Sequence, residues 1–318
     1  MSRPDPGRRA APSSGRLHRG LTGDRELVGT RYLQDASLRQ AYDEQMAPRT
    51  RAALARVFAA APAPQGSPPV RRALDLGAGT GAAGEAVRAQ FGSGVEVVSV
   101  DQVAAAPGML VADLARPGRP PGVEGKFDLV VAAHLLNELA GRCTVAQRAE
   151  VVTAWCRELL ADAGRVVIVE PALRETSRDL LAIRDLLLAR GLFVVAPCLW
   201  QGPCPALARD RDWCHDAAPA VAAGRSRVDF SYLVVQHAGS AATDPTLFRV
   251  VSDRLEEKGR LRLFGCGPAG RHPLVRLDRD ASPANAPFAQ VERGDLLRVA
   301  GTRAAGDGLR VEKDSTVG

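Results

Sequence analysis

The 318-residue sequence contains no run of about 18 apolar residues, the length that a membrane-spanning helix requires. Hydrophobic residues make up 46% of the chain and charged residues 25%, as in ordinary globular proteins. We therefore expect a protein without membrane contact, long enough to bury a sizeable core.

Cysteine is also scarce, with six residues in the whole chain, and the first residues lack the apolar stretch of a secretory leader. Secreted disulfide-rich domains have a much higher cysteine density. The thiols are therefore expected to be reduced or to bind a metal, and we expect a cytoplasmic protein.

Lysine is nearly missing, since only Lys126, Lys258 and Lys313 occur among the 42 basic residues. The net charge of +6 therefore comes from arginine, and it permits an acidic partner such as nucleic acid. A codon-composition bias explains the arginine content equally well. Residues 1–25 are predicted to be a disordered basic tail, with an organelle-targeting segment as the alternative.

Three further regions follow from the hydrophobic pattern. Residues 26–65 are predicted to be a helical segment, with two helices separated near Pro48. Residues 66–240 alternate apolar strands with helices, which predicts an α/β, mostly parallel, doubly wound sheet of Rossmann-like type. Residues 241–318 are predicted to be a small β-rich C-terminal unit. The predicted strands are 72–77, 95–101, 127–134, 165–171, 192–198, 229–237, 259–266, 273–279, 295–301 and 308–313.

A glycine-rich turn, "LDLGAGTGAAG", joins the first predicted strand to the first helix. Glycines let the backbone approach a ligand closely, and the helix N-terminus offers free N–H groups. Asp101 ends the second strand, where a carboxylate can accept hydrogen bonds from ribose hydroxyls, and Asp113 follows the expected third strand. The candidate donor-binding residues are Asp75, Gly77, Ala78, Gly79, Gly81, Asp101 and Asp113.

The acidic residue before G-x-G-x-G resembles the first motif of the class I S-adenosylmethionine-dependent methyltransferases. The resemblance implies that residues 75–81 surround S-adenosylmethionine, that Asp101 binds its ribose and that Asp113 lies near its adenine. A Rossmann-like fold with an empty pocket is the alternative.

Catalytic residues are not identified by the sequence. The Asn/Asp-Pro-Pro-aromatic motif of many amino-directed methyltransferases is missing after the strand 127–134. Asn137 and Glu138 could contact a substrate or cap the following helix, and His134 is expected to pack at the strand end. Cys143 and Cys156 occupy predicted helices and are expected to be buried structural thiols.

The other four cysteines follow a different pattern. Cys198, Cys204 and Cys214 lie within 17 residues of one loop, 196–216, that is rich in proline and tryptophan, and Cys266 lies in a later glycine-containing segment. Irregularly spaced thiolates in loops suit a four-cysteine site for zinc or an iron–sulfur cluster. Scattered free thiols are the alternative.

A narrower resemblance rests on "VVAPCLWQGPCP", "DWCH" and "FSYLVV", after "LLNEL" and "VEP". These segments resemble the methyltransferase-like family associated with the small subunit of mitochondrial ribosomes, which has bacterial members. The resemblance covers about residues 74–266. It implies a [4Fe–4S] cluster on Cys198, Cys204, Cys214 and Cys266, with zinc as the alternative, and contact with small-subunit ribosomal RNA.

The resulting hypothesis is a methyltransferase-like protein that acts on the small ribosomal subunit by rRNA methylation or assembly. Residues 254–279 hold seven basic and three acidic side chains and could follow an RNA backbone. Two alternatives remain: a non-catalytic assembly factor that binds the donor and rRNA, and a zinc-stapled methyltransferase of a small molecule or protein. We expect a monomer and no DNA binding.

Overall fold

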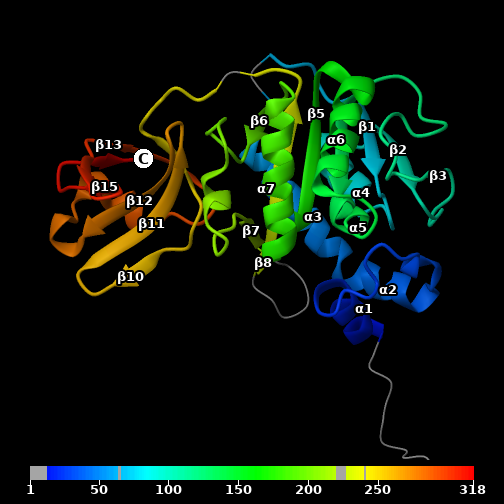
Figure 1. The fold of residues 1–318 in the computed structure, drawn as a ribbon, viewed down its shortest axis with the longest axis horizontal. Coiled ribbons are helices and arrows are strands. Elements are labelled where there is room, and N and C mark those ends of the chain that lie inside the picture. Colours follow the sequence, from blue (N-terminus) through cyan, green and yellow to red (C-terminus); the bar gives the residue numbers. More distant parts are fainter. Residues whose placement is uncertain (1–12, 64–65, 220–226, 240) are drawn as a thin grey trace, which may run out of the picture.

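The structure is a computed structural model that describes residues 13–63, 66–219, 227–239 and 241–318. Within these residues, two β-sheets of eight strands form the framework (Figure 1). Helices cover the first sheet, and the second sheet lies beside it at the C-terminal end of the chain. No described helix combines the length and apolarity needed to cross a bilayer.

The first half of the first sheet is parallel. Its strands are β1 (Arg72–Leu76), β2 (Glu96–Asp101), β3 (Leu110–Val111), β4 (Phe127–Ala133) and β5 (Leu160–Pro171). They lie in the order β3-β2-β1-β4-β5, and each pairs in parallel with its neighbours. The ends of β1, β2 and β4 therefore meet at one edge of the sheet, as the Rossmann-like prediction requires.

The second half of this sheet corrects the prediction of a mostly parallel sheet. It contains β6 (Phe193–Ala196), β7 (Asp216–Pro219) and β8 (Arg227–Gln236). β8 lies between β5 and β6 and is antiparallel to β5, β6 and β7, so the sheet is mixed. Antiparallel neighbours need no crossover helix between them, unlike the parallel strands of the first half.

Helices pack on both faces of the first sheet. One face carries α3 (Ala47–Ala60) and α4 (Ala82–Phe91); the other carries α5 (Leu135–Leu139), α6 (Val145–Leu159) and α7 (Arg174–Ala189). A hydrophobic core lies on each face of the sheet, and alternate residues of β4 point into the two cores. Val131 packs in the core under α3 and α4, and Val130 packs in the core under α6 and α7. Cys156 is buried in the second core with Trp155, as expected of a structural thiol.

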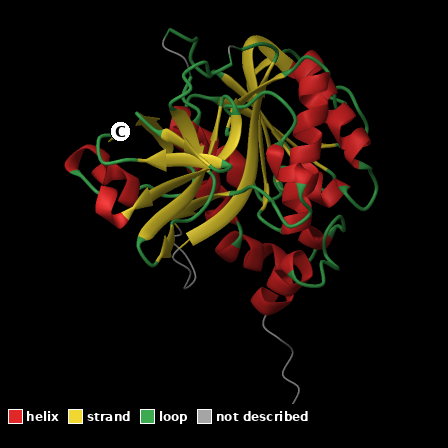
Figure 2. Cartoon of the chain, turned by 60° about the vertical axis from the view of Figure 1, so that its left-hand side comes forward, coloured by secondary structure: helices red, strands yellow, loops and turns green. Residues whose placement is uncertain are grey.

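The N-terminal helices lie beside the first sheet, at the lower end of the molecule (Figure 2). Their buried residues form a third, small core. They are α1 (Ser13–Thr22), the 3₁₀ turn η1 (Tyr32–Gln34) and α2 (Ala36–Gln45). The prediction of a disordered tail through residue 25 is wrong for 13–22, because Leu17 is fully buried against this core; residues 1–12 lie outside the described residues. The two helices predicted around Pro48 are α2 and α3, and Pro48 lies in the first turn of α3.

The second sheet contains the four segments predicted as strands beyond residue 241. Its order is β14-β15-β12-β11-β9-β13-β16, with β10 on β11, and its core includes Phe248, Leu263, Leu274 and Phe288. The 3₁₀ turns are η2 (Pro205–Ala208), η3 (Asp278–Asp280) and η4 (Pro283–Ala289). The strands are β9 (Leu247–Val250), β10 (Leu255–Glu257), β11 (Arg260–Gly267), β12 (Gly270–Leu277), β13 (Leu296–Ala300), β14 (Arg303–Ala305), β15 (Gly308–Val311) and β16 (Thr316–Val317).

Candidate functional site

The glycine turn connects β1 to α4 at the edge where the parallel strands end. Gly77, Gly79 and Gly81 have φ angles of 73°, 52° and 92°, a backbone region that favours glycine. A Cβ atom on Gly77 would also lie 3.2 Å from the Leu135 side chain. The N–H groups of Gly77 and Ala78 donate to the carbonyl of Val100, at 2.8 and 3.1 Å, so the turn is fixed to β2.

Two aspartates support this turn. The carboxylate of Asp101, at the end of β2, accepts a 2.8 Å hydrogen bond from the Gly79 N–H, and burial raises the pKa of Asp101. Asp75 is buried within β1 and accepts a 3.0 Å hydrogen bond from the Gly84 N–H in the first turn of α4. Burial raises the pKa of Asp75 to about 7.

A pocket opens in front of the turn and is lined by Gly77, Gly79 and Asp101. Asp75, Ala78 and Gly81 shape the turn behind it. Asp113 pairs with Arg142 through two hydrogen bonds of 3.1 and 2.7 Å, while the next residue along the chain, Leu114, lines the pocket. The other lining residues are Gly29, Thr30, Arg31, Tyr32, Leu33, Tyr42, Gln102, Val103, Ala133, His134, Leu135, Glu138 and Leu139.

A larger cavity of about 410 Å³ adjoins this pocket and shares four of its lining residues. They are Tyr32, Tyr42, His134 and Glu138. The tyrosines come from the N-terminal helical segment, and His134 and Glu138 from the end of β4 and from α5. The sequence analysis missed both tyrosines, since no local motif marks them. They could have been identified only by knowing that the N-terminal helical segment packs against the ends of the strands.

The groups at this boundary are held in neutral forms. Desolvation lowers the pKa of His134 to about 4, and burial followed by the charge of Asp101 raises the pKa of Glu138 to about 8. The Tyr32 hydroxyl donates to the Glu138 carboxyl at 3.4 Å. Asn137 accepts a 2.5 Å hydrogen bond from Arg25, so of the two residues considered from sequence, Glu138 is the one that lines both cavities.

A third pocket lies between the first sheet, the cysteine loop and the second sheet. Cys198, Cys204, Cys214 and Cys266 all line it, and none of these four is part of a disulfide. Within the part of the chain that the structure describes, no three His, Cys, Asp or Glu side chains form a ready metal-binding group. The predicted ligands therefore share one pocket without being drawn together around a single point.

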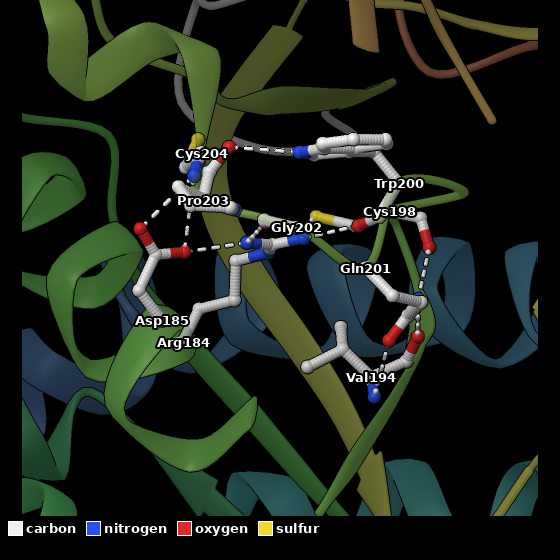
Figure 3. A network of polar contacts seen from close by, with 9 residues as sticks. All are labelled: Arg184, Asp185, Val194, Cys198, Trp200, Gln201, Gly202, Pro203 and Cys204. Carbon is white, nitrogen blue, oxygen red and sulfur yellow. Dashed lines mark hydrogen bonds and ion pairs between the residues drawn. The ribbon is translucent and has the colours of Figure 1, made fainter. Parts of the chain in front are cut away.

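Helix α7 fixes the cysteine loop by polar contacts (Figure 3). Arg184, 1% exposed, donates to the Cys198 sulfur at 3.3 Å, to the Gly202 carbonyl at 2.7 Å and to the Trp200 carbonyl. Asp185 accepts a 2.9 Å hydrogen bond from the Cys204 N–H. Two cysteines are thus held at defined positions by adjacent residues of one helix.

Burial raises the pKa of three of these thiols. The pKa of Cys204 rises to about 11 and that of Cys214 to about 12, and the pKa of Cys266 is also raised. The charge of the Cys198 thiolate is the next largest cause for each of them, because the sulfur atoms are near enough to repel one another when charged. A bound cation would remove that repulsion.

The second sheet closes the cysteine pocket from the other side. Cys266 lies in β11, opposite Arg249 of β9 and Arg271 of β12. Arg271 forms a 3.1 Å ion pair with Asp212 of the cysteine loop. The loop is therefore held by both sheets.

The basic stretch 254–279 is mostly engaged within the protein. Arg260 and Arg262 both pair with Glu257, and Arg276 is buried and donates to Asn285. Arg254 donates to the Ala289 carbonyl, and Arg271 pairs as described. Five of the seven basic side chains thus have internal partners, so this stretch offers less free positive charge than its sequence suggests.

Comparison with known proteins gives a family and several distant structural neighbours. The family model described as mitochondrial small ribosomal subunit Rsm22 matches residues 37–253. No functionally curated protein matches the sequence.

Three solved structures, two of them of methyltransferases, are among the structural neighbours. Mitomycin 7-O-methyltransferase MmcR is 16% identical with a TM-score of 0.39, over 71% of this chain and 68% of that one. Plantazolicin methyltransferase BpumL, in complex with SAH, is 14% identical with a TM-score of 0.33, over 54% of this chain and 62% of that one. TrmN from Thermus thermophilus is 19% identical with a TM-score of 0.33, over 58% of this chain and 47% of that one. The chain thus spans less than two thirds of BpumL and of TrmN.

Proposed function

This chain belongs to the family of the mitochondrial small ribosomal subunit protein Rsm22, and from that premise we propose that it binds S-adenosylmethionine and methylates RNA of a small ribosomal subunit. The observation that carries the proposal is the pocket in front of the glycine turn, where Asp101 and the turn lie side by side at the ends of parallel strands. Ligands of open α/β sheets bind at this edge.

The residues around the pocket fit the donor. Gly77, Ala78, Gly79 and Gly81 would let the backbone approach its amino-acid part, and Asp101 would accept hydrogen bonds from its ribose hydroxyls. Asp75 would act by fixing the start of α4. We propose that the segment at Asp113 and Leu114 borders the adenine through Leu114, because the Asp113 side chain is held by Arg142. When bound, the donor would supply an electrophilic methyl group on a sulfonium.

The cysteine pocket would hold a [4Fe–4S] cluster on Cys198, Cys204, Cys214 and Cys266, with zinc as the alternative. Four thiols lining one pocket are the number and kind of donors that both groups accept. A metal would offset the repulsion that the thiolates exert on one another once they are deprotonated. The group would join the cysteine loop to the second sheet through Cys266 and has a structural role in this proposal.

A second candidate function is a non-catalytic assembly factor that binds the donor and ribosomal RNA. Burial raises the pKa of Glu138 to about 8, so this carboxyl group is mostly protonated at pH 7. His134, with a pKa of about 4, is also a weak base. A methyl transfer that relies on proximity and on the sulfonium leaving group needs little help from a base, so both candidates fit this boundary.

Methyl incorporation separates the two candidates. Small-subunit particles from cells lacking the protein would be incubated with the purified protein and tritiated S-adenosylmethionine, and radioactivity in the RNA measured. We expect incorporation that falls at least tenfold with Asp101→Ala and stays unchanged with Asp43→Ala, an exposed residue of α2. Donor binding and comigration with small-subunit precursors without incorporation would establish the assembly factor. If the protein shows no methyl incorporation and no comigration with small-subunit precursors, the ribosomal proposal is refuted.

A further inference from the structure

The cavity beside the donor pocket lies between the N-terminal helical segment and the ends of β4, β5 and β8. Leu21 and Met46 line it from the N-terminal side, and Ala172 and Phe230 from the sheet. Its volume of about 410 Å³ falls within the roughly 300–1,000 Å³ usual for small-ligand pockets. It meets the donor pocket at Tyr32, Tyr42, His134 and Glu138, so a group bound here faces whatever occupies the donor pocket.

His134 stands at this boundary in an unusual conformation. Its φ angle of 63° is in the left-handed region, which residues other than glycine rarely adopt, and it directly follows β4. Its Nδ1 atom is buried and has no hydrogen-bond partner among the described residues. A strained backbone and an unsatisfied buried nitrogen in the wall of a cavity both indicate a ligand.

Glu138 supplies a second polar group in the same wall. Because burial keeps this carboxyl protonated at neutral pH, it offers one hydrogen-bond donor and one acceptor side by side. Such a pair complements the polar edge of a heterocyclic base, on which acceptor and donor atoms also adjoin. A protonated lysine or a phosphate would find less suitable partners, since lysine requires acceptors and phosphate requires donors.

The remaining walls are aromatic and charged. The rings of Tyr32 and Tyr42 lie with centroids 6.3 Å apart and planes inclined at 44°, and the buried Phe230 lies in the same cavity. Arg49 and Arg227 also line it, together with Asp229, which pairs with Arg227 at 2.6 Å. Between residues 13 and 60 the chain carries eight arginines against five acidic residues. Aromatic side chains surround an unstacked base, and arginines attract the adjoining phosphates.

We infer that this cavity takes a single nucleobase extruded from an RNA strand, with His134 and Glu138 hydrogen-bonding its polar edge. The inference rests on the proposed function, because it makes the cavity the acceptor site for the donor bound next to it. The inference assigns RNA contact to the N-terminal helical segment and the strand ends, and not to the basic stretch 254–279.

The test is fluorescence anisotropy of the full chain with a fluorescein-labelled 12-nucleotide single-stranded RNA of mixed sequence, in the presence of S-adenosylhomocysteine. Ala172→Trp fills the cavity from a position outside the donor pocket, Glu138→Leu removes the polar edge, and Glu138→Gln keeps a donor and an acceptor. Glu175→Gln, on the exposed start of α7, is the matched control. For every variant, titration calorimetry with S-adenosylhomocysteine measures donor binding. Scanning calorimetry measures the melting temperature and so reports folding.

We expect Ala172→Trp and Glu138→Leu to weaken RNA binding at least tenfold, and Glu138→Gln and Glu175→Gln to change it less than threefold. An RNA without bases should bind the wild type as weakly as intact RNA binds Ala172→Trp. Equal RNA affinity of wild type and Ala172→Trp, or of intact and abasic RNA, would overturn the inference. Displacement of the RNA by a lysine- and glutamine-rich 12-residue peptide from wild type alone would assign the cavity to a protein side chain and overturn it too.

Failure of the proposed function can be told apart from failure of the nucleobase inference. A wild type that binds no S-adenosylhomocysteine refutes donor binding, whatever the RNA result. RNA affinity that still depends on Ala172 and Glu138 in that case would support the nucleobase cavity alone.

Discussion

Three carboxyl groups lie near the ends of the parallel strands where water is excluded. Burial raises the pKa of Asp75 to about 7 and those of Glu138 and Glu170 to about 8. Each is therefore protonated in the folded protein at pH values where the unfolded chain has already lost the proton. Because the unfolded chain binds fewer protons at these pH values, the free energy of unfolding falls as the pH rises through the folded-state pKa values.

This linkage predicts the pH dependence of stability between pH 7 and 8.5. In that window the folded state binds more protons than the unfolded state, so the free energy of unfolding decreases as pH rises. The lowered pKa values of His134 and His215, about 4, act mainly below pH 7 and so do not oppose this slope. Glu138→Gln should reduce the slope, measured by urea denaturation at four pH values. A slope equal to that of Glu175→Gln and wild type would contradict the assigned protonation.

The sequence identified the residues that a strand end positions, and it missed those that depend on tertiary contact. Asp101 was predicted because the carboxyl ends of adjacent parallel strands meet at one edge of a sheet, and it does lie beside Gly79. Tyr32 and Glu138 are 106 residues apart, and no periodicity could pair them. Likewise, no local motif marks Arg184, whose side chain donates to the Cys198 sulfur.

At the level of elements, α7 and the cysteine loop form one unit. Arg178 donates to the carbonyls of Ala206, Arg209 and Asp212 at distances from 2.6 to 3.2 Å, and Arg184 and Asp185 hold the segment 198–204. The carbonyl groups of an irregular loop lack the backbone N–H partners of a helix or sheet, and the arginines of α7 donate hydrogen bonds to them instead. The conformation of the loop is therefore set by a helix that precedes it in the chain.

Replacing Arg184 tests this arrangement. Arg184→Met keeps most of the apolar volume but leaves the carbonyls of Trp200 and Gly202 unpaired, which should cost on the order of 3 kcal/mol of unfolding free energy. Arg174→Met, which removes contacts to the exposed Asp210 carbonyl, should cost less than about 1 kcal/mol. Urea denaturation gives the free energies, and faster hydrogen exchange at 198–204 in Arg184→Met alone should locate the change. Equal losses in both variants would argue against a specific role of Arg184.

At the scale of the whole molecule, Arg56 of α3 joins parts that are distant in sequence. Its guanidinium pairs with Asp295, before β13, at 3.0 Å and lies 3.9 Å from Asp216 at the start of β7. Cys266 reaches the cysteine pocket from the second sheet. The two sheets thus meet at the cysteine loop, and a group bound by all four thiols would strengthen that junction.

Metal content tests this junction. Protein purified without oxygen should contain about four irons and four sulfides per chain, or one zinc if zinc is the occupant. Cys204→Ser should lose most of that metal, whereas Cys156→Ser should retain it, because Cys156 is buried in the core beside Trp155 and is no ligand. Metal content that is equal in the two variants, or missing from the wild type, would remove the metal assignment.

The proposed function depends on the claim that the donor binds at the end of β2, and calorimetric titration with S-adenosylhomocysteine measures this binding. The wild type should bind one molecule per chain, and Asp101→Ala should bind at least tenfold more weakly while its melting temperature stays close to that of the wild type. No binding by the wild type, or unchanged affinity in Asp101→Ala, would contradict the claim.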